Sequence, residues 1–265
     1  ANPQFGTKVQ KVERKSADVF IALDVSRSMW TEDIAPSRMD RASRFTQNLI
    51  ESLAGERIGL ILFAGNAYMQ MPLTTDYAAA LLFAKSANPD LAPSQGTSIA
   101  EAIQLAQRSF DEENKNYKAL VVITDGEDHE GEAITLAEEA NADGLLIFTI
   151  GVGTANGSLI PTTVNGYTDY LRDNSGNPVR SALNEGLLQD IAQAGDGSYF
   201  NLNAGEEAIV NAIRSGIDQL EKQEMEQRVF DEYNSWFQLP LGIALVLIII
   251  EFFISYRRSR LLEGR

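Results

Sequence analysis

Cysteine is absent from this chain of 265 residues, and histidine occurs once, as His129. The absence of cysteine excludes a disulfide framework, a thiolate zinc site and a cysteine nucleophile. Basic residues are scarce as well, with 22 Lys and Arg against 37 Asp and Glu and a net charge of −15. Nucleic acid is therefore not expected as a partner, because phosphate binding depends on clustered Lys and Arg.

Residues 18–205 alternate apolar runs with amphipathic stretches. The runs at 19–23, 58–64, 119–124 and 145–152 lack polar alternation, as strands covered on both faces do. Apolar residues at helical spacing lie between them, in the sets Ala42, Phe45, Leu49, Leu53 and Ile99, Ile103, Ala106, Phe110, and in residues 132–142, which Gly144 ends. We therefore predict an α/β fold with a doubly wound, mostly parallel sheet. Residues 67–74, after a turn at Gly65-Asn66, are predicted as one antiparallel edge strand.

One segment of this domain, residues 156–180, breaks the alternation and is rich in Gly, Asn, Thr and Pro. Residues 167–171 and 178–179 are predicted as the arms of a hairpin around residues 174–177. The segment has two interpretations: a surface insertion without a role of its own, or a loop that docks a partner.

The chain after the domain divides into three parts. Residues 206–235 are predicted as an amphipathic and stalk helix, since Ile209, Ile213, Ile217 and Leu220 share one stripe before a charged second half. Residues 236–256 are predicted as a transmembrane helix, long enough for a hydrocarbon core of roughly 30 Å. The basic tail, residues 257–265, is placed in the cytoplasm by the positive-inside rule. The domain then lies in the periplasm, anchored to the bacterial inner membrane.

Glu251 lies inside the predicted span. A carboxylate in a membrane helix commonly faces a partner helix, so Glu251 is a candidate contact for an oligomer or a hetero-complex. Two alternatives are that it reaches the inner interface or that it pairs with Arg258.

Oxygen-bearing side chains gather where the predicted strands end. Asp24, Ser26 and Ser28 follow the first strand as Asp24-Val-Ser-Arg-Ser28, Asp125 follows the third, and Thr97 ends a loop before a helix. In a doubly wound sheet these positions meet at the carboxyl edge, where the strand order reverses. Hydroxyl and carboxylate oxygens suit a small divalent cation such as Mg²⁺, with Mn²⁺ or Ca²⁺ as alternatives.

Each of these residues also has a structural interpretation. Ser26, Ser28 and Thr97 are residue types that cap helices, and Asp125 before Gly126 is typical of a turn. His129, among acidic residues in a loop, is interpreted as solvated rather than as a ligand. Catalysis is not predicted, because phosphoryl-transfer sites with an aspartyl nucleophile need a second carboxylate two residues on, where Ser26 stands.

The chain resembles the von Willebrand factor type A family, whose metal-ion-dependent adhesion site is Asp-x-Ser-x-Ser with a separate Thr and Asp. The resemblance implies that Ser26, Ser28 and Thr97 bind Mg²⁺ directly, that Asp24 and Asp125 act through water, and that a partner's Asp or Glu completes the coordination. Within this family the chain is similar to the BatA/BatB-like membrane proteins of bacterial aerotolerance operons. The similarity rests on residues 22–29, 73–77, 95–97 and 123–131.

The BatA/BatB-like resemblance has further implications. Such proteins usually carry membrane helices before the domain, so residues 1–17 are expected to be a linker after a missing one. Partners are expected among related type A membrane proteins, with an indirect link to a MoxR-type AAA+ ATPase. The expected function is Mg²⁺-dependent binding of a protein in an envelope complex. The alternative is a structural subunit that assembles through residues 206–256, with the metal only stabilising loops.

Overall fold

A computed structural model describes residues 16–110, 117–128, 131–164, 167–231 and 241–251. Residues 15–221 form one compact unit, and residues 1–14 with 222–265 form another, so that each is described by itself. Three parts of the chain named above lie outside the described residues: residues 1–15 of the predicted linker, His129, and the basic tail 257–265.

A six-stranded sheet forms the centre of the first unit. Its strands are β1 (Asp18–Asp24), β2 (Arg57–Phe63), β3 (Ala67–Thr74), β4 (Lys118–Thr124), β5 (Leu145–Gly151) and β10 (Tyr199–Asn201). They lie in the order β10-β5-β4-β1-β2-β3, and only β3 pairs antiparallel. The chain winds outward in one direction from β1 and in the other from β4, so the order reverses between these two strands. This reversal opens a binding position at their carboxyl ends.

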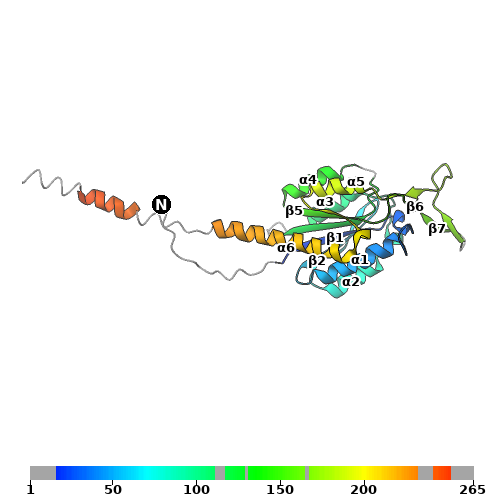
Figure 1. The fold of residues 1–265 in the computed structure, drawn as a ribbon, viewed down its shortest axis with the longest axis horizontal. Helices are drawn as coiled ribbons and strands as arrows, with labels where there is room; N and C mark the ends of the chain where they lie inside the picture. Colours follow the sequence, from blue (N-terminus) through cyan, green and yellow to red (C-terminus); the bar gives the residue numbers. More distant parts are fainter. Residues whose placement is uncertain (1–15, 111–116, 129–130, 165–166, 232–240, 252–265) are drawn as a thin grey trace, which may run out of the picture. The chain divides into compact units, whose positions relative to one another are not determined.

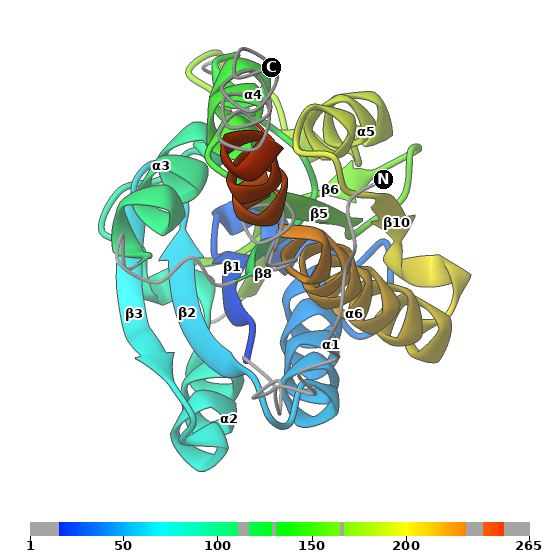
Figure 2. The ribbon, with the colours of Figure 1, turned by 90° about the vertical axis from the view of Figure 1, so that its left-hand side faces the viewer.

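Helices cover both faces of the sheet (Figures 1 and 2). On one face lie α1 (Arg38–Ser52), α2 (Tyr77–Ser86) and the first half of α6 (Glu206–Asp231), and on the other α3 (Ile99–Ser109), α4 (Ala133–Ala142) and α5 (Glu185–Ala194). Strand side chains alternate between the two cores: Val19, Ile21 and Leu23 enter the first, while Phe20 and Ala22 enter the second. This two-sided burial explains why the strand sequences show no polar alternation.

The predicted fold class is confirmed for the sheet and its antiparallel edge strand. The sequence did not, however, reveal α2, α5 or β10. Helix α2 has apolar residues on its exposed side as well as on its buried side, and Leu82 is 65% exposed. Its sequence therefore shows no single apolar stripe that would predict a helix. The three residues of β10 are too few to show a period.

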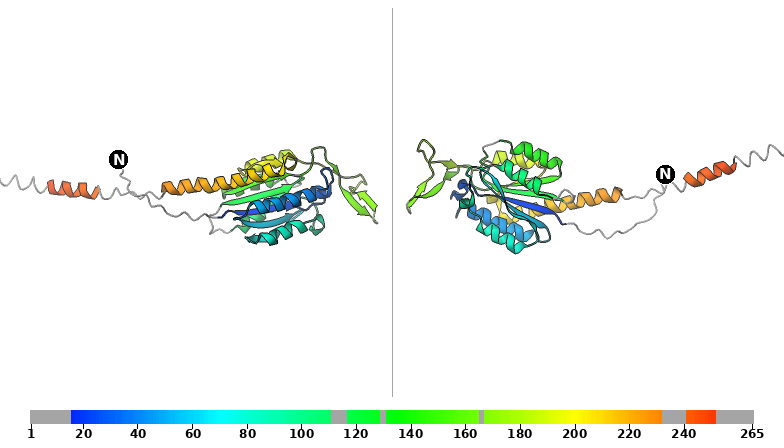
Figure 3. Two further views of the ribbon diagram at one scale, coloured as in Figure 1. Left: turned by 60° about the horizontal axis from the view of Figure 1, so that its bottom comes forward. Right: turned by 180° about the vertical axis from the view of Figure 1, so that it is seen from behind.

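The segment 156–180 forms the expected hairpin only at its inner end. There the backbone N–H of Val179 donates to the carbonyl of Leu171 at 2.7 Å, and Arg172 pairs antiparallel with Pro178. The rest of the first predicted arm, strand β8 (Tyr167–Tyr170), pairs with β7 (Pro161–Val164) instead. The predicted turn at 174–177 is present, because Asp173 accepts bonds from the backbone of Ser175 and Asn177. A second pair, β6 (Ser158–Leu159) with β9 (Arg180–Ser181), forms the base of the segment. The β7–β8 ribbon extends beyond the end of the central sheet (Figure 3).

The first half of α6 packs on the sheet, as the apolar stripe predicts. Ile209, Ile213 and Ile217 are buried in the core that contains Phe148 of β5. Gly216 allows this approach, because a Cβ there would lie 2.7 Å from the Phe148 ring. The side chain of Leu220 lies outside the described residues.

The predicted membrane span is described only over residues 241–251, which are helical and exposed. Within the described part of the chain, no helix is both long and apolar enough to cross a membrane. Residues 236–240 and 252–256 of the predicted span lie outside that part.

We predict that Ile213→Ala lowers the free energy of unfolding by about 2–5 kcal/mol, because it leaves a cavity between α6 and the sheet. Urea unfolding followed by circular dichroism measures the change. Ser215→Ala is the control, since Ser215 is exposed on the same helix and its truncation should change stability by less than about 0.5 kcal/mol. Equal effects of the two substitutions would contradict the packing of α6.

Candidate metal and partner-binding site

The candidate site lies at the carboxyl edge of the sheet, between β1 and β4. Asp24 is the last residue of β1, and Asp125 follows the last residue of β4. The Thr97 loop reaches the same edge, because the next residue, Ser98, donates its backbone N–H to Ala64 just after β2. A second bond joins the same loop to the first: the backbone N–H of Arg27 donates to Gln95 at 3.2 Å. Residues from three separate segments are thus brought together.

Asp24 is fully buried, and both carboxylate oxygens accept hydrogen bonds. Oδ1 accepts from the backbone of Ser26 at 2.8 Å, and Oδ2 accepts from the hydroxyl of Thr124 at 2.5 Å. Burial and the nearby charge of Asp125 raise the pKa of Asp24 to about 7, against the opposing effect of these bonds. Burial and the charge of Asp125 thus disfavour the negative form of Asp24 more than its hydrogen bonds favour it.

Ser28 lies in η1 (Arg27–Trp30), the short 3₁₀ helix after β1, and Ser26 directly precedes this helix. Ser26 occupies the N-cap position but makes no side-chain capping bond. Its hydroxyl instead bonds the hydroxyl of Ser28 at 2.8 Å. Two hydroxyl oxygens thus lie together beside Asp24, and the capping interpretation of Ser26 is wrong.

Thr97 is not a helix cap either. The residue that caps α3 is Ser98, whose side chain accepts from the backbone of Glu101. Thr97 is 5% exposed, in the loop that contacts η1.

Asp125 is buried and held by three groups. Its Oδ1 accepts from the backbone of Glu127 at 3.2 Å, as the turn interpretation expects. Its Oδ2 accepts from Arg38 at 2.8 Å and from the hydroxyl of Ser181 at 3.3 Å. The ion pair with Arg38 joins residues that are 87 positions apart in the chain.

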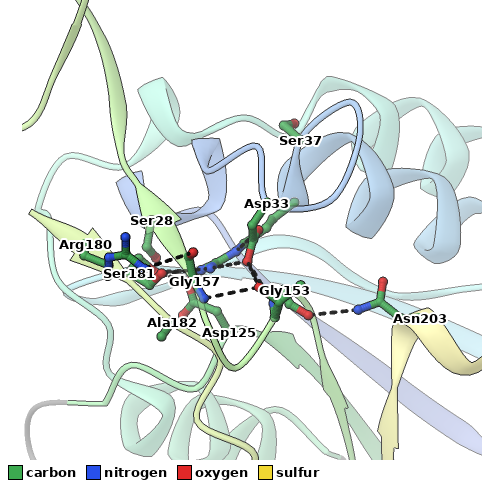
Figure 4. Close-up of polar contacts among 12 residues, drawn as sticks. Ser28, Asp33, Ser37, Asp125, Gly153, Gly157, Arg180, Ser181, Ala182 and Asn203 are labelled. Carbon is green, nitrogen blue, oxygen red and sulfur yellow. Dashed lines mark hydrogen bonds and ion pairs between the residues drawn. The ribbon is translucent and has the colours of Figure 1, made fainter.

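Arg38 is the first residue of α1, and its side chain is 0% exposed. The guanidinium forms a bidentate pair with Asp33, through Nε to Oδ1 at 2.8 Å and Nη2 to Oδ2 at 2.9 Å. It also donates to the hydroxyl of Ser181 at 2.6 Å and to its carbonyl at 3.1 Å. Figure 4 labels three of the residues named here, Asp33, Asp125 and Ser181. Burial opposes the charge, but the bonds and charges of Asp33 and Asp125 raise the pKa of Arg38.

Glu127 connects the same edge to the inserted segment. Its Oε1 accepts from the backbone of Ala182 at 3.1 Å. Burial and the charge of Asp125 raise the pKa of Glu127.

Four residues of this network were not predicted from the sequence as site residues: Asp33, Arg38, Ser181 and Glu127. One signal was present: position 38 precedes Ala42 by four residues, so it extends the apolar stripe of the predicted helix. A charged residue on a buried stripe indicates a paired cation, because an unpaired charge is rarely buried completely. No comparable signal marks Ser181, which directly follows the inserted segment 156–180.

The oxygen atoms at this edge that could bind a metal ion belong mainly to hydroxyls, together with two carboxylates. Within the described residues, no group of three or more His, Cys, Asp or Glu side chains is placed to hold a metal ion. A site of this kind would therefore depend on Ser and Thr oxygens, which suit Mg²⁺ as hard ligands.

We predict that Asp33→Asn lowers the free energy of unfolding by about 3 kcal/mol at pH 7, because it leaves the buried Arg38 partly unpaired. Burial opposes the effect, but the hydrogen bond and charge of Arg38 hold the pKa of Asp33 below its ordinary value of 3.8. A lowered folded pKa means that ionised Asp33 stabilises the fold above about pH 3.8, and that this stabilisation is lost as the pH falls further.

The difference between wild type and Asp33→Asn should thus shrink below about pH 3.8. Urea unfolding at a series of pH values measures it, with Glu32→Gln as the control at an exposed neighbouring carboxylate. A pH-independent difference would contradict the ion pair.

Comparison with known proteins agrees with this geometry. The family model described as the von Willebrand factor type A domain matches residues 19–127. A UPF0353 protein of Nocardia farcinica is 27% identical over 271 residues, covering 95% of this chain and 76% of the relative. The chain spans only 58% of a similar protein from Mycolicibacterium paratuberculosis.

Two solved structures are more similar in sequence. The conserved hypothetical protein BatB from Bacteroides thetaiotaomicron is 42% identical with a TM-score of 0.72, covering 77% of this chain and 100% of that one. An aerotolerance-related membrane protein from Bacteroides fragilis is 39% identical with a TM-score of 0.70, covering 76% of this chain and 100% of that one. The chain therefore belongs to the BatB-like, aerotolerance-related branch of the von Willebrand factor type A family.

Proposed function

We propose that this chain is a binding module that holds Mg²⁺ at the carboxyl edge of its sheet and captures an Asp or Glu carboxylate of a protein partner. The observation that carries the proposal is the pair of hydroxyls of Ser26 and Ser28, which bond each other at 2.8 Å instead of capping a helix. They lie beside Asp24, whose buried negative charge protein groups leave under-stabilised. A cation at this edge would supply the missing stabilisation.

In this proposal Ser26, Ser28 and Thr97 bind the ion, and Asp24 and Asp125 hold its water ligands. The donors include few negative charges, and Arg38 already balances that of Asp125. A bound cation would therefore retain affinity for an outside carboxylate. Three protein oxygens, two waters and one partner oxygen make six ligands, which suits the octahedral preference of Mg²⁺ better than the six to eight oxygens of Ca²⁺.

We further propose that residues 236–256 anchor the chain in the bacterial inner membrane, with the domain in the periplasm and the basic tail in the cytoplasm. The apolar composition of the helical residues 241–251 supports the anchor. A similar protein from Bacteroides fragilis is called an aerotolerance-related membrane protein. On this basis the partner belongs to an envelope complex, with related type A membrane proteins as candidates and any MoxR-type ATPase linked indirectly.

The second candidate function is a structural subunit that assembles through residues 206–256. Glu251, at the end of the described helix 241–251, favours this alternative, since a carboxylate on an apolar helix needs a polar or charged partner. In that case the metal would only stabilise loops, and partner binding would be independent of it.

Capture of partners from native membranes distinguishes the two. Tagged full-length protein is tested in Mg²⁺, in EDTA, and as the Asp24→Ala variant in Mg²⁺. A partner that is lost both in EDTA and with Asp24→Ala supports metal-bridged binding. A partner that is kept in all three conditions, but lost when residues 232–265 are removed, assigns the function to the helices.

We predict that Thr97→Ala weakens Mg²⁺ binding by at least about tenfold, since it removes an oxygen ligand whose loss should matter no less than that of an outer-shell partner. Isothermal titration calorimetry measures the affinity, and circular dichroism should show an unchanged fold. Thr75→Ala, at an exposed threonine, is the matched control. Unchanged Mg²⁺ affinity in Thr97→Ala would contradict the assigned ligand set.

A further inference from the structure

We propose that Arg38 is a positioning residue that couples the metal site to the inserted segment 156–180 through the residue that follows it, Ser181, so that Mg²⁺ binding and the order of this segment are thermodynamically linked. The inference rests on the proposed function, because it concerns the same site. It assigns a role to the segment whose sequence was open to two interpretations.

The donors of Arg38 are fully used by three residues. A guanidinium has five N–H donors in a fixed plane. Nε and one Nη2 hydrogen bond Asp33, the other Nη2 hydrogen bonds the carbonyl of Ser181, and the two Nη1 hydrogens bond Asp125 and the hydroxyl of Ser181. Lysine, with three donors at one point, cannot reproduce this planar arrangement.

The position of Arg38 is unfavourable for the helix that carries it. A cation at a helix N-terminus opposes the macrodipole, and complete burial of a charge is costly. The stability of α1 does not explain an arginine at this position. The contacts of its guanidinium do, because they join three separate parts of the chain.

Asp33 and Arg38, which form an ion pair with each other, hold the two ends of the inserted segment. At its start, Asp33 accepts from the backbone and hydroxyl of Thr154 at 2.8 and 2.9 Å. At its end, Ser181 of β9 bonds Arg38 and Asp125. Gly153 leaves room for the guanidinium, since a Cβ there would lie 2.7 Å from Nε. Movement of Arg38 would therefore disturb both ends together.

Arg38 and Ser181 also determine which oxygen of Asp125 faces the metal. A carboxylate has about four acceptor positions. Among the described residues, Arg38 and Ser181 take those on Oδ2, and the backbone of Glu127 takes one on Oδ1. One position on Oδ1 is left for a water ligand of the ion, so the geometry of this contact depends on the bonds to Arg38 and Ser181.

Such an arrangement makes the coupling reciprocal. If the bonds of Arg38 and Ser181 favour Mg²⁺ binding, bound Mg²⁺ stabilises those bonds by the same free energy. The base of the segment, the β6–β9 pair, should then open less often when the metal is bound.

The test uses the full chain in detergent with MgCl₂ as the ligand. Hydrogen exchange, followed by mass spectrometry, is measured over residues 158–181 with and without Mg²⁺, together with Mg²⁺ affinity by calorimetry. In the wild type, Mg²⁺ should slow exchange at residues 158–159 and 180–181 by about fivefold. Arg38→Lys keeps the positive charge but loses the planar set of five N–H donors. It should therefore weaken Mg²⁺ binding by about tenfold, and Mg²⁺ should no longer slow hydrogen exchange even at a saturating concentration.

Arg44→Lys, at an exposed arginine of α1, is the matched control and should behave as wild type. If Arg38→Lys does not fold, Ser181→Ala decides, because it removes only the hydroxyl that joins β9 to Asp125 and Arg38. Mg²⁺ binding to the wild type without any change in exchange at residues 158–181 overturns the coupling alone. Failure of the wild type to bind Mg²⁺ overturns the proposed function as well.

Discussion

Two carboxylates end neighbouring buried strands, and their desolvation is the constraint on which the site depends. Asp24 and Asp125 are both 0% exposed, at the point where the sheet reverses its strand order. A buried negative charge must be bonded or paired, because water is not available to solvate it. Thr124 and the backbone of Ser26 bond the first carboxylate, and Arg38 pairs with the second.

The two carboxylates are treated differently by their surroundings. Asp125 has a full positive charge within 2.8 Å, whereas Asp24 has only hydrogen bonds and the repulsion of its neighbour. This asymmetry leaves one negative charge uncompensated beside two hydroxyls. In the proposed function, this asymmetry would draw a cation toward Asp24 and leave that cation able to bind an external carboxylate.

The strands and the turn whose signals lie within a few neighbouring residues were predicted from the sequence. Unbroken apolar runs predicted β1, β2, β4 and β5, and the Gly65-Asn66 turn predicted the antiparallel β3. The sequence also predicted that Asp24 ends a strand at the carboxyl edge of the sheet, and the structure places it there. These features are encoded within a few residues of each other, where spacing and turn chemistry are informative.

The remaining features depend on contacts between distant segments. The bonds from Arg38 to Asp125 and to Ser181 span 87 and 143 positions, and no spacing rule connects such residues. The pairing of β8 with β7 was missed because short polar strands offer no periodic signal to choose between partners. Family resemblance supplied the proposed ligand set, but it did not indicate Arg38, which pairs with Asp125.

The attachment of the inserted segment also bears on how such a domain could be re-engineered. Thr154 and Ser181 fasten its two ends to the same ion pair, while β7 and β8 pair only with each other in the described chain. Lengthening a loop between fixed ends costs little, about 0.6 kcal/mol for each doubling. The β7–β8 ribbon could therefore be replaced by foreign sequence. A segment grafted between Thr154 and Ser181 would be displayed beside the sheet edge while the rest of the domain stays unchanged.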